Sequence, residues 1–181
     1  MNRTIIKLFF YLCILTALPS YAQNAVHYYF KTMDIRNGLS QNTVYQILQD
    51  RKGFMWFGTK DGLNRYDGLS YRVYKKENSG LGKNFITALY EDHEGNIWIG
   101  TDGGVFIYNP VLDSFTAFNQ TSDKGTVIKD FVTMIGSDEY DNIWISVENQ
   151  GLFCYNHEKR LRNYLHDSGT VSYTHLTLPT I

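Results

Sequence analysis

Cysteine is almost absent from this chain, which has 2 cysteines in 181 residues. One of them, Cys13, lies in an apolar run near the N-terminus without the sequence context of a lipidated cysteine, and the other is Cys154. Removal of the N-terminal run would leave a single thiol and exclude an intramolecular disulfide. Packing rather than cross-linking must then supply the stability.

The net charge of the chain is also small, and proline is scarce. The formal net charge is −1, so the chain lacks the strongly basic character of nucleic-acid-binding domains. Only 3 prolines interrupt it, whereas aromatic residues make up 15% of the sequence. Because aromatic rings pack well on pleated sheets, this composition favours β-strands and argues against disorder.

Long hydrophobic runs are missing beyond residue 22. The preceding segment carries Arg3 and Lys7, an apolar stretch at residues 8–18 and a small-x-small motif at residues 20–22. This is the pattern of a secretory signal peptide, residues 1–22, cut after Ala22. An uncleaved membrane anchor is the alternative, but the apolar stretch is shorter than the roughly 20 residues that span a bilayer. We expect an exported protein without a membrane span after the signal peptide.

Catalytic motifs are missing as well. The sequence has no Gly-x-Ser-x-Gly, no His-Glu-x-x-His, no paired cysteines and no glycine-rich phosphate loop, and its 5 histidines are scattered. We therefore expect no catalytic residue, no metal ligand and no cofactor in this chain.

What the chain does have is a repeat marked by tryptophan. Trp98 follows Trp56 by 42 residues, and Trp144 follows Trp98 by 46. Each tryptophan comes six residues after an aspartate and six or seven residues before a glycine that a tyrosine follows four positions later. A period of about 40–50 residues is typical of repeat folds such as propellers. The three aspartates are Asp50, Asp92 and Asp138.

The second repeat is the clearest unit. Strands are expected at residues 85–91, 97–101, 105–108 and 114–118, with turn residues between them. Four short antiparallel strands of this kind make one blade of a β-propeller. The sequence thus predicts an all-β fold, a partial propeller of three four-stranded blades at residues 38–79, 80–123 and 124–170.

The repeated tryptophans are expected to fill the space between adjacent blades, each burying ~150–250 Å². Gly58 and Gly100, two residues after a tryptophan, are expected to let a neighbouring backbone come close, and Ser146 replaces them in the third repeat. A platform for sugar stacking is the alternative role for these indoles. A tryptophan inside an apolar strand is, however, typical of a core.

Two segments lie outside the three blades. Tyr28–Ile35, within residues 23–37, is expected to be an orphan outer strand of a ring-closing blade, because its apolar residues have the spacing of the outermost strand of blade 1. Closed propellers have about four to eight blades, so we expect the remaining blades elsewhere in a longer protein. Residues 171–181 leave the repeat register and carry no charge. We interpret them as translated sequencing-adapter DNA, with the first strand of a fourth blade as the alternative.

Polar residues also recur in register. The three aspartates are expected to accept hydrogen bonds from backbone N–H groups in turns. In a propeller, the loops that enter the innermost strands and those between second and third strands meet at one face near the axis. Their polar side chains are candidate ligand contacts, with ordinary solvated turns as the alternative, and comprise Asn42, Lys60, Asp61, Asn84, Asp102, Asp130, Glu148 and Asn149.

The combined motif consists of Asp-x-x-Gly-x-x-Trp-x-Gly-Thr followed by Gly-Leu/Val-x-x-Tyr, with Gly-Leu-Ser-Gln-Asn at residues 38–42. It resembles the two-component regulator propeller repeat. The resemblance runs from about Tyr28 to Tyr164. It implies the periplasmic sensor region of a hybrid two-component system of Bacteroidetes, a homodimer that responds to oligosaccharides and signals through a membrane-bound histidine kinase. Kinase, receiver and helix-turn-helix motifs are missing here, so this chain itself is expected to be neither an enzyme nor a DNA-binding protein.

Other classes of protein stay open. A fragment of a secreted propeller enzyme, such as a lyase, would fit the repeat, as would a propeller-fronted cyclase or a plain extracellular binding module. A membrane span and kinase motifs encoded downstream of residue 170 would support the sensor, whereas further blades with clustered histidines and carboxylates would support the enzyme.

Overall fold

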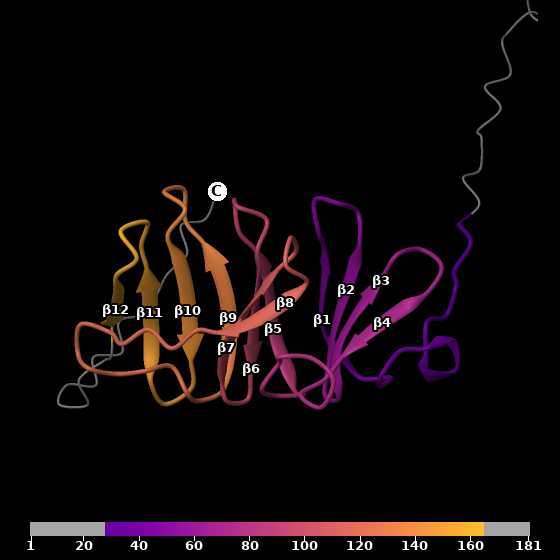
Figure 1. Cartoon of the computed structure of the whole chain (residues 1–181), viewed down its shortest axis with the longest axis horizontal. Coiled ribbons are helices and arrows are strands. Elements are labelled where there is room, and N and C mark those ends of the chain that lie inside the picture. The colour runs from indigo at the N-terminus through magenta and orange to yellow at the C-terminus, as the bar shows by residue number, and fades with distance from the viewer. Residues whose placement is uncertain (1–27, 165–181) are drawn as a thin grey trace, which may run out of the picture. The chain divides into compact units, whose positions relative to one another are not determined.

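The computed structural model describes residues 28–164 of the chain, as twelve strands and one short 3₁₀ helix. The strands form three antiparallel sheets of four strands each, and strand order within each sheet follows the chain (Figure 1). The predicted all-β propeller architecture is therefore confirmed. The signal peptide expected at residues 1–22 and the tail at residues 171–181 lie outside the described residues.

Each sheet is one blade, numbered here in chain order. Blade 1 contains β1 (Val44–Gln49), β2 (Met55–Thr59), β3 (Gly62–Tyr66) and β4 (Tyr71–Tyr74). Blade 2 contains β5 (Ile86–Glu91), β6 (Ile97–Thr101), β7 (Gly104–Asn109) and β8 (Ser114–Ala117). Blade 3 contains β9 (Val132–Ser137), β10 (Ile143–Val147), β11 (Gly151–Tyr155) and β12 (Leu161–Tyr164). Within residues 28–164, no helix has the length and apolar character needed to cross a membrane.

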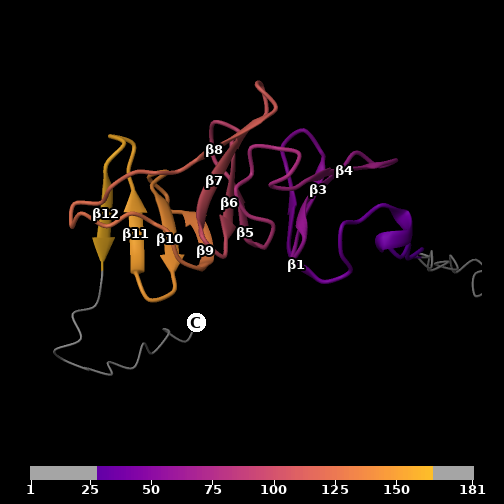
Figure 2. The same ribbon diagram turned by 60° about the horizontal axis from the view of Figure 1, so that its bottom comes forward.

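Adjacent blades pack through their first two strands. The first strand of blade 2, β5, contacts β1 on one side and β9 on the other, and Figures 1 and 2 show the three sheets side by side. Between blades 1 and 2, Trp56 packs with Leu81 and Ile86 in one apolar cluster. Between blades 2 and 3, Trp98 packs with Val132 and others in a second.

The three tryptophans differ in burial according to what covers them. Trp56 is 1% exposed and Trp98 is 3% exposed, because each is enclosed by the following blade. Trp144 lies on the outer side of blade 3, is half-buried, and contacts Tyr164 at a ring-centroid distance of 5.6 Å. The repeated indole thus occupies the space between blades wherever the described residues supply a following blade.

The sequence predicts that a neighbouring backbone comes close to the repeat glycines. In the structure it is a side chain that comes close. A Cβ atom placed on Gly58 would lie 2.8 Å from Cγ2 of Ile86, and one on Gly100 would lie 2.7 Å from Cγ1 of Val132. Ile86 and Val132 are the first residues of β5 and β9, so each glycine receives the innermost strand of the following blade. Ser146 has the same register in blade 3, where its hydroxyl lies 2.9 Å from that of Thr133.

Replacement of Gly100 by alanine is expected to destabilise the protein by about 1–3 kcal/mol, because the added methyl overpacks a filled interface. Urea unfolding monitored by tryptophan fluorescence would measure the loss. Gly136, on β9, has no atom within 4 Å of the Cβ position and supplies the matched control. Equal stability changes in the two variants would contradict this packing role.

The structure shows no strand at Tyr28–Ile35, and the predicted pairing of this segment with a ring-closing blade outside this chain stays a prediction. Residues 28–34 have no strand assignment, and the chain turns into a 3₁₀ helix, η1, at Ile35–Asn37. Asp34 caps that helix by accepting a hydrogen bond from the backbone N–H of Arg36, and Gly38 closes it with a φ of 108°. The physical reason is twofold: the local sequence stabilises a capped turn, and no strand in the described part of the chain pairs with this segment to form a ladder.

Candidate functional site

The connections between strands gather at two opposite faces of the blades. Because each sheet is an antiparallel meander, the turns between second and third strands lie at the same end as the loops that enter the first strands. We call this end the entry face. The turns between first and second strands and between third and fourth strands lie at the other end, the hairpin face. All eight ligand-contact candidates from the sequence belong to connections of the entry face.

A pocket of about 410 Å³ opens on the entry face between blades 1 and 2. It brings together three of the predicted residues, Lys60, Asn84 and Asp102. Lys60 comes from the β2–β3 turn, Asp102 from the β6–β7 turn, and Asn84 from the loop before β5. The sequence analysis missed the other members of its lining, which are Lys76, Gly82, Lys83 and Phe85.

A repeated threonine shapes the two turns that contribute Lys60 and Asp102. The hydroxyl of Thr59 donates to the carbonyl of Gly62 at 2.9 Å and accepts from the N–H of Asp61 at 3.1 Å. Thr101 makes the corresponding bonds in blade 2, at 2.8 Å and 3.2 Å. Both threonines are fully buried, so the two tight turns hold the exposed residue at their tip in a fixed position.

Asn84 anchors the pocket wall. Its Oδ1 accepts a hydrogen bond from the backbone N–H of Lys76 at 2.8 Å, and its carbonyl accepts one from the N–H of Gly62 at 2.7 Å. Asn42 is used in the same way, since its Oδ1 accepts from the N–H of Ile35 at 2.9 Å. Asn84 therefore orients the loop between blades 1 and 2, and Asn42 orients the segment that enters blade 1. The side chains free for a ligand are those around them.

The pocket is rich in positive charge. Lys60, Lys76 and Lys83 line it, and Asp102 is the single carboxylate in the lining. Lys83 lies against the β6–β7 turn, where a side chain at Gly103 would collide with it. An excess of ammonium groups around a pocket favours ligands with carboxylate, sulfate or phosphate groups.

The other predicted residues lie elsewhere on the entry face. Asp61 forms an ion pair with Lys75 at 2.6 Å, outside the pocket lining. Asp130 accepts a hydrogen bond from the neighbouring N–H of Phe131 at 2.8 Å. Glu148 and Asn149 occupy the β10–β11 turn of blade 3, where Asn149 has a φ of 58°. The pocket does not include these four residues or Asn42.

The repeated aspartates have a second partner that the sequence analysis missed. Besides bonding backbone N–H groups of their own turn, Asp50, Asp92 and Asp138 each accept the indole N–H of the tryptophan six residues later, at 2.8, 2.8 and 2.9 Å. Hydrogen bonds from Asn142 and Trp144 lower the pKa of Asp138 to about 2. The constant six-residue spacing in the sequence was the available signal for this pair.

No cluster of three or more histidine, cysteine, aspartate or glutamate side chains suited to a metal occurs among residues 28–164. The free thiol of Cys154 is buried, and burial raises its pKa. The polar side chains of the entry-face candidates in the described part of the chain are lysines, amides and carboxylates.

Comparison with known sequences identifies the repeat. The family described as two component regulator propeller matches residues 38–61 and 80–103, which cover the start of blades 1 and 2. Histidine kinase P4 of Formosa agariphila is 42% identical over 59 residues, which are 33% of this chain and 4% of that protein.

Comparison with solved structures gives the same assignment. An extracellular domain of a hybrid two component system from B. thetaiotaomicron is 29% identical with a TM-score of 0.65, over 74% of this chain and 20% of that one. An extracellular domain of a one component system from the same organism is 28% identical with a TM-score of 0.63, over 74% of this chain and 19% of that one. The chain therefore spans about a fifth of the length of the structures that it resembles.

Proposed function

Since this chain carries two-component regulator propeller repeats and matches extracellular sensor domains, we propose that it forms part of the periplasmic ligand-sensing propeller of a hybrid two-component system. The ligand is an oligosaccharide that binds at the entry face. The full protein passes the signal through a membrane-bound histidine kinase.

The observation that carries this proposal is the pocket between blades 1 and 2. Small-molecule sites are concave and hold a few convergent polar groups. This pocket holds three ammonium groups beside Asn84 and Asp102, and one of the three, that of Lys76, lies 3.8 Å from the carboxylate of Glu77. Ammonium groups form charge-assisted hydrogen bonds to carboxylates and sulfates, while Asp102 can accept from sugar hydroxyls. We therefore propose that the oligosaccharide is acidic, with uronic acid or sulfated residues.

Signalling follows from differential binding. We propose that the intact receptor is a homodimer whose sensor domains have two arrangements, and that the oligosaccharide binds one arrangement more tightly. The ligand can shift the equilibrium only by its difference in affinity for the two arrangements. A ligand in the pocket would contact two blades at once, because Lys60 belongs to blade 1 and Asp102 to blade 2.

Replacement of Lys83 by glutamate is expected to weaken binding of acidic oligosaccharides by about tenfold or more, because an attractive charge becomes a repulsive one. Isothermal titration of the full chain with oligogalacturonides, and with neutral malto-oligosaccharides for comparison, would measure this. Lys52→Glu provides the control, since Lys52 is exposed in the β1–β2 turn on the hairpin face and makes the same charge change. Equal affinity of Lys83→Glu and the unaltered chain for the acidic series would refute the proposed site.

A further inference from the structure

At the hairpin face, the interface between blades 1 and 2 and the interface between blades 2 and 3 are filled by different side chains. Between blades 1 and 2, the side chain of Arg65 fills the space beside the tryptophan, with which it pairs across β2 and β3. Its guanidinium carbon lies 4.7 Å from the ring centre of Phe54 and 5.8 Å from that of Trp56. Its Nη1 donates to the hydroxyl of Tyr108 in blade 2 at 3.1 Å.

A carboxylate completes this filled interface. The hydroxyl of Tyr108 donates to Oδ1 of Asp113 at 2.7 Å, and Asp113 also forms an ion pair with Arg72 of blade 1 at 2.7 Å. Guanidinium, phenol and carboxylate therefore form a hydrogen-bonded chain from one blade to the next. Burial and the bond to Asp113 raise the pKa of Tyr108, so this hydroxyl keeps its proton.

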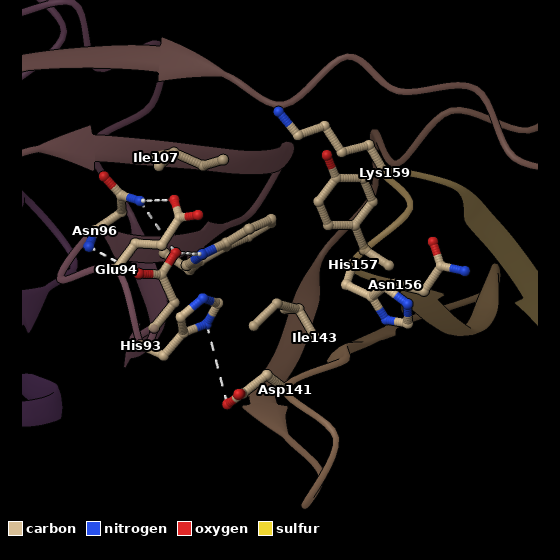
Figure 3. A pocket seen from close by; sticks show the side chains of 12 residues that line it. His93, Glu94, Asn96, Ile107, Asp141, Ile143, Asn156, His157 and Lys159 are labelled. Atoms are coloured by element: carbon tan, nitrogen blue, oxygen red, sulfur yellow. Dashed lines mark hydrogen bonds and ion pairs between the residues drawn. The ribbon is translucent and has the colours of Figure 1, made fainter.

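The next interface has the same frame but lacks both charged groups. Across β6 and β7, Trp98 pairs with Ile107 in place of an arginine. Tyr155 stands in the register of Tyr108, and Lys159, with a φ of 61°, stands in that of Asp113, whose φ is 49°. The result is a cavity of about 220 Å³ (Figure 3). Its lining includes polar groups from both blades as well as Trp98, Ile107, Tyr155 and Lys159.

The lining of this cavity holds the carboxylates of Glu94 from blade 2 and Asp141 from blade 3, and the ammonium of Lys159 from blade 3. Glu94 of blade 2 lies on one wall and Lys159 of blade 3 on the other, as Figure 3 shows, and neither forms an ion pair among the described residues. Oδ1 of Asp141 lies 4.0 Å from Nδ1 of His93 at the rim. Asp92 is already satisfied by the indole of Trp98 and the amide of Asn96, so it is not free for a ligand. The amide of Asn96 also donates to Oε2 of Glu94 at 3.2 Å, which leaves Oε1 of Glu94 for a ligand. The cavity thus offers an aromatic wall, an acid on one side and an ammonium on the other.

We propose that this cavity binds a small ligand that carries both a guanidinium and a carboxylate group, such as free arginine or a C-terminal arginine of a peptide. The ligand supplies the two groups that Arg65 and Asp113 supply at the preceding interface. Its guanidinium lies against the half-buried ring of Tyr155 and the small part of Trp98 that the cavity leaves exposed, with Glu94 as its counter-ion, and its carboxylate pairs with Lys159. Stacking on an aromatic ring and pairing with a carboxylate are the two interactions that the guanidinium favours in proteins.

The experiment compares ligands that differ in one group at a time. Isothermal titration of the full chain would use arginine and glycyl-arginine, the latter as the peptide form. It would also use agmatine, which lacks the carboxylate of arginine, and citrulline, which lacks the positive charge of the guanidinium. Arginine or glycyl-arginine is expected to bind about tenfold more tightly than agmatine and citrulline. The tighter of the two identifies the source. Absence of arginine and glycyl-arginine binding, or citrulline binding as well as arginine, would overturn the proposal.

Two variants locate the site within the molecule. Ile107→Arg places a guanidinium where Arg65 has one, fills the cavity from within, and is expected to abolish arginine binding while the melting temperature is retained. Lys159→Met removes the partner of the carboxylate at an exposed position and is expected to bring the affinity for arginine down to that for agmatine, with agmatine unchanged. Unaltered arginine binding by Lys159→Met would place the ligand elsewhere, even if Ile107→Arg failed to fold.

Discussion

Replacement of Trp98 by alanine is expected to lower the free energy of unfolding by about 3–5 kcal/mol, as for other large aromatic residues removed from a core. Trp98 is 3% exposed and packs between blades 2 and 3, with its ring centre 5.1 Å from that of Phe118 and 5.8 Å from that of Tyr155. Neither blade can collapse into the cavity, because each is held by its own backbone ladder. Urea unfolding of the full chain, followed by far-ultraviolet circular dichroism, would measure the loss.

Trp144→Ala is the matched control for this prediction. Trp144 has the same register and the same bond to its aspartate, but it is half-buried and its main aromatic neighbour is Tyr164 of its own blade. The loss should be about half as large or less, because stabilisation scales with the apolar area removed from water. Equal losses in the two variants would mean that the indole acts through its own blade, and the proposed role between blades would be wrong.

The sequence predicted the fold well because the repeat is dictated by local rules. Alternating β-forming residues and turn residues recur at each blade, and the observed strands of blade 2 begin or end within one residue of the expected ones. The exception is Tyr28–Ile35, where the described residues contain no partner strand and the pairing with a ring-closing blade stays a prediction. A strand requires a partner for its backbone groups, and apolar spacing says nothing about whether one is present.

The candidate site was only partly predictable. Lys60, Asn84 and Asp102 were found because their positions follow from the repeat. Lys76 and Lys83 were not found, because the spacing of the repeat does not show which side chains of the loop from β4 to β5 face the pocket. The hairpin-face cavity was missed for a different reason. It arises because Ile107 stands where Arg65 stands in blade 1, and this difference is visible only when the two interfaces are compared in space.

Replacement of Asp92 by alanine is expected to cost about 2–4 kcal/mol, because it leaves buried donors without an acceptor. Asp92 is 7% exposed and accepts hydrogen bonds from the backbone N–H of Asn96 at 2.8 Å, from its side-chain amide at 3.2 Å and from the indole of Trp98 at 2.8 Å. The indole cannot turn to water, since Trp98 is enclosed by two blades. Thermal and urea unfolding of the full chain would give the change in stability.

Asp102→Ala removes a carboxylate from the same blade and serves as the control. Asp102 is exposed at the β6–β7 turn and makes no side-chain hydrogen bond among the described residues, so its loss should change stability by no more than ~0.5 kcal/mol. Asp92→Asn tests the geometry further: it keeps one acceptor oxygen but turns an amide donor toward other donors, so its stability should fall between those of the unaltered chain and Asp92→Ala. If Asp92→Ala were as stable as Asp102→Ala, the bond to the indole would contribute nothing. The six-residue spacing of aspartate and tryptophan in all three repeats would then need another cause.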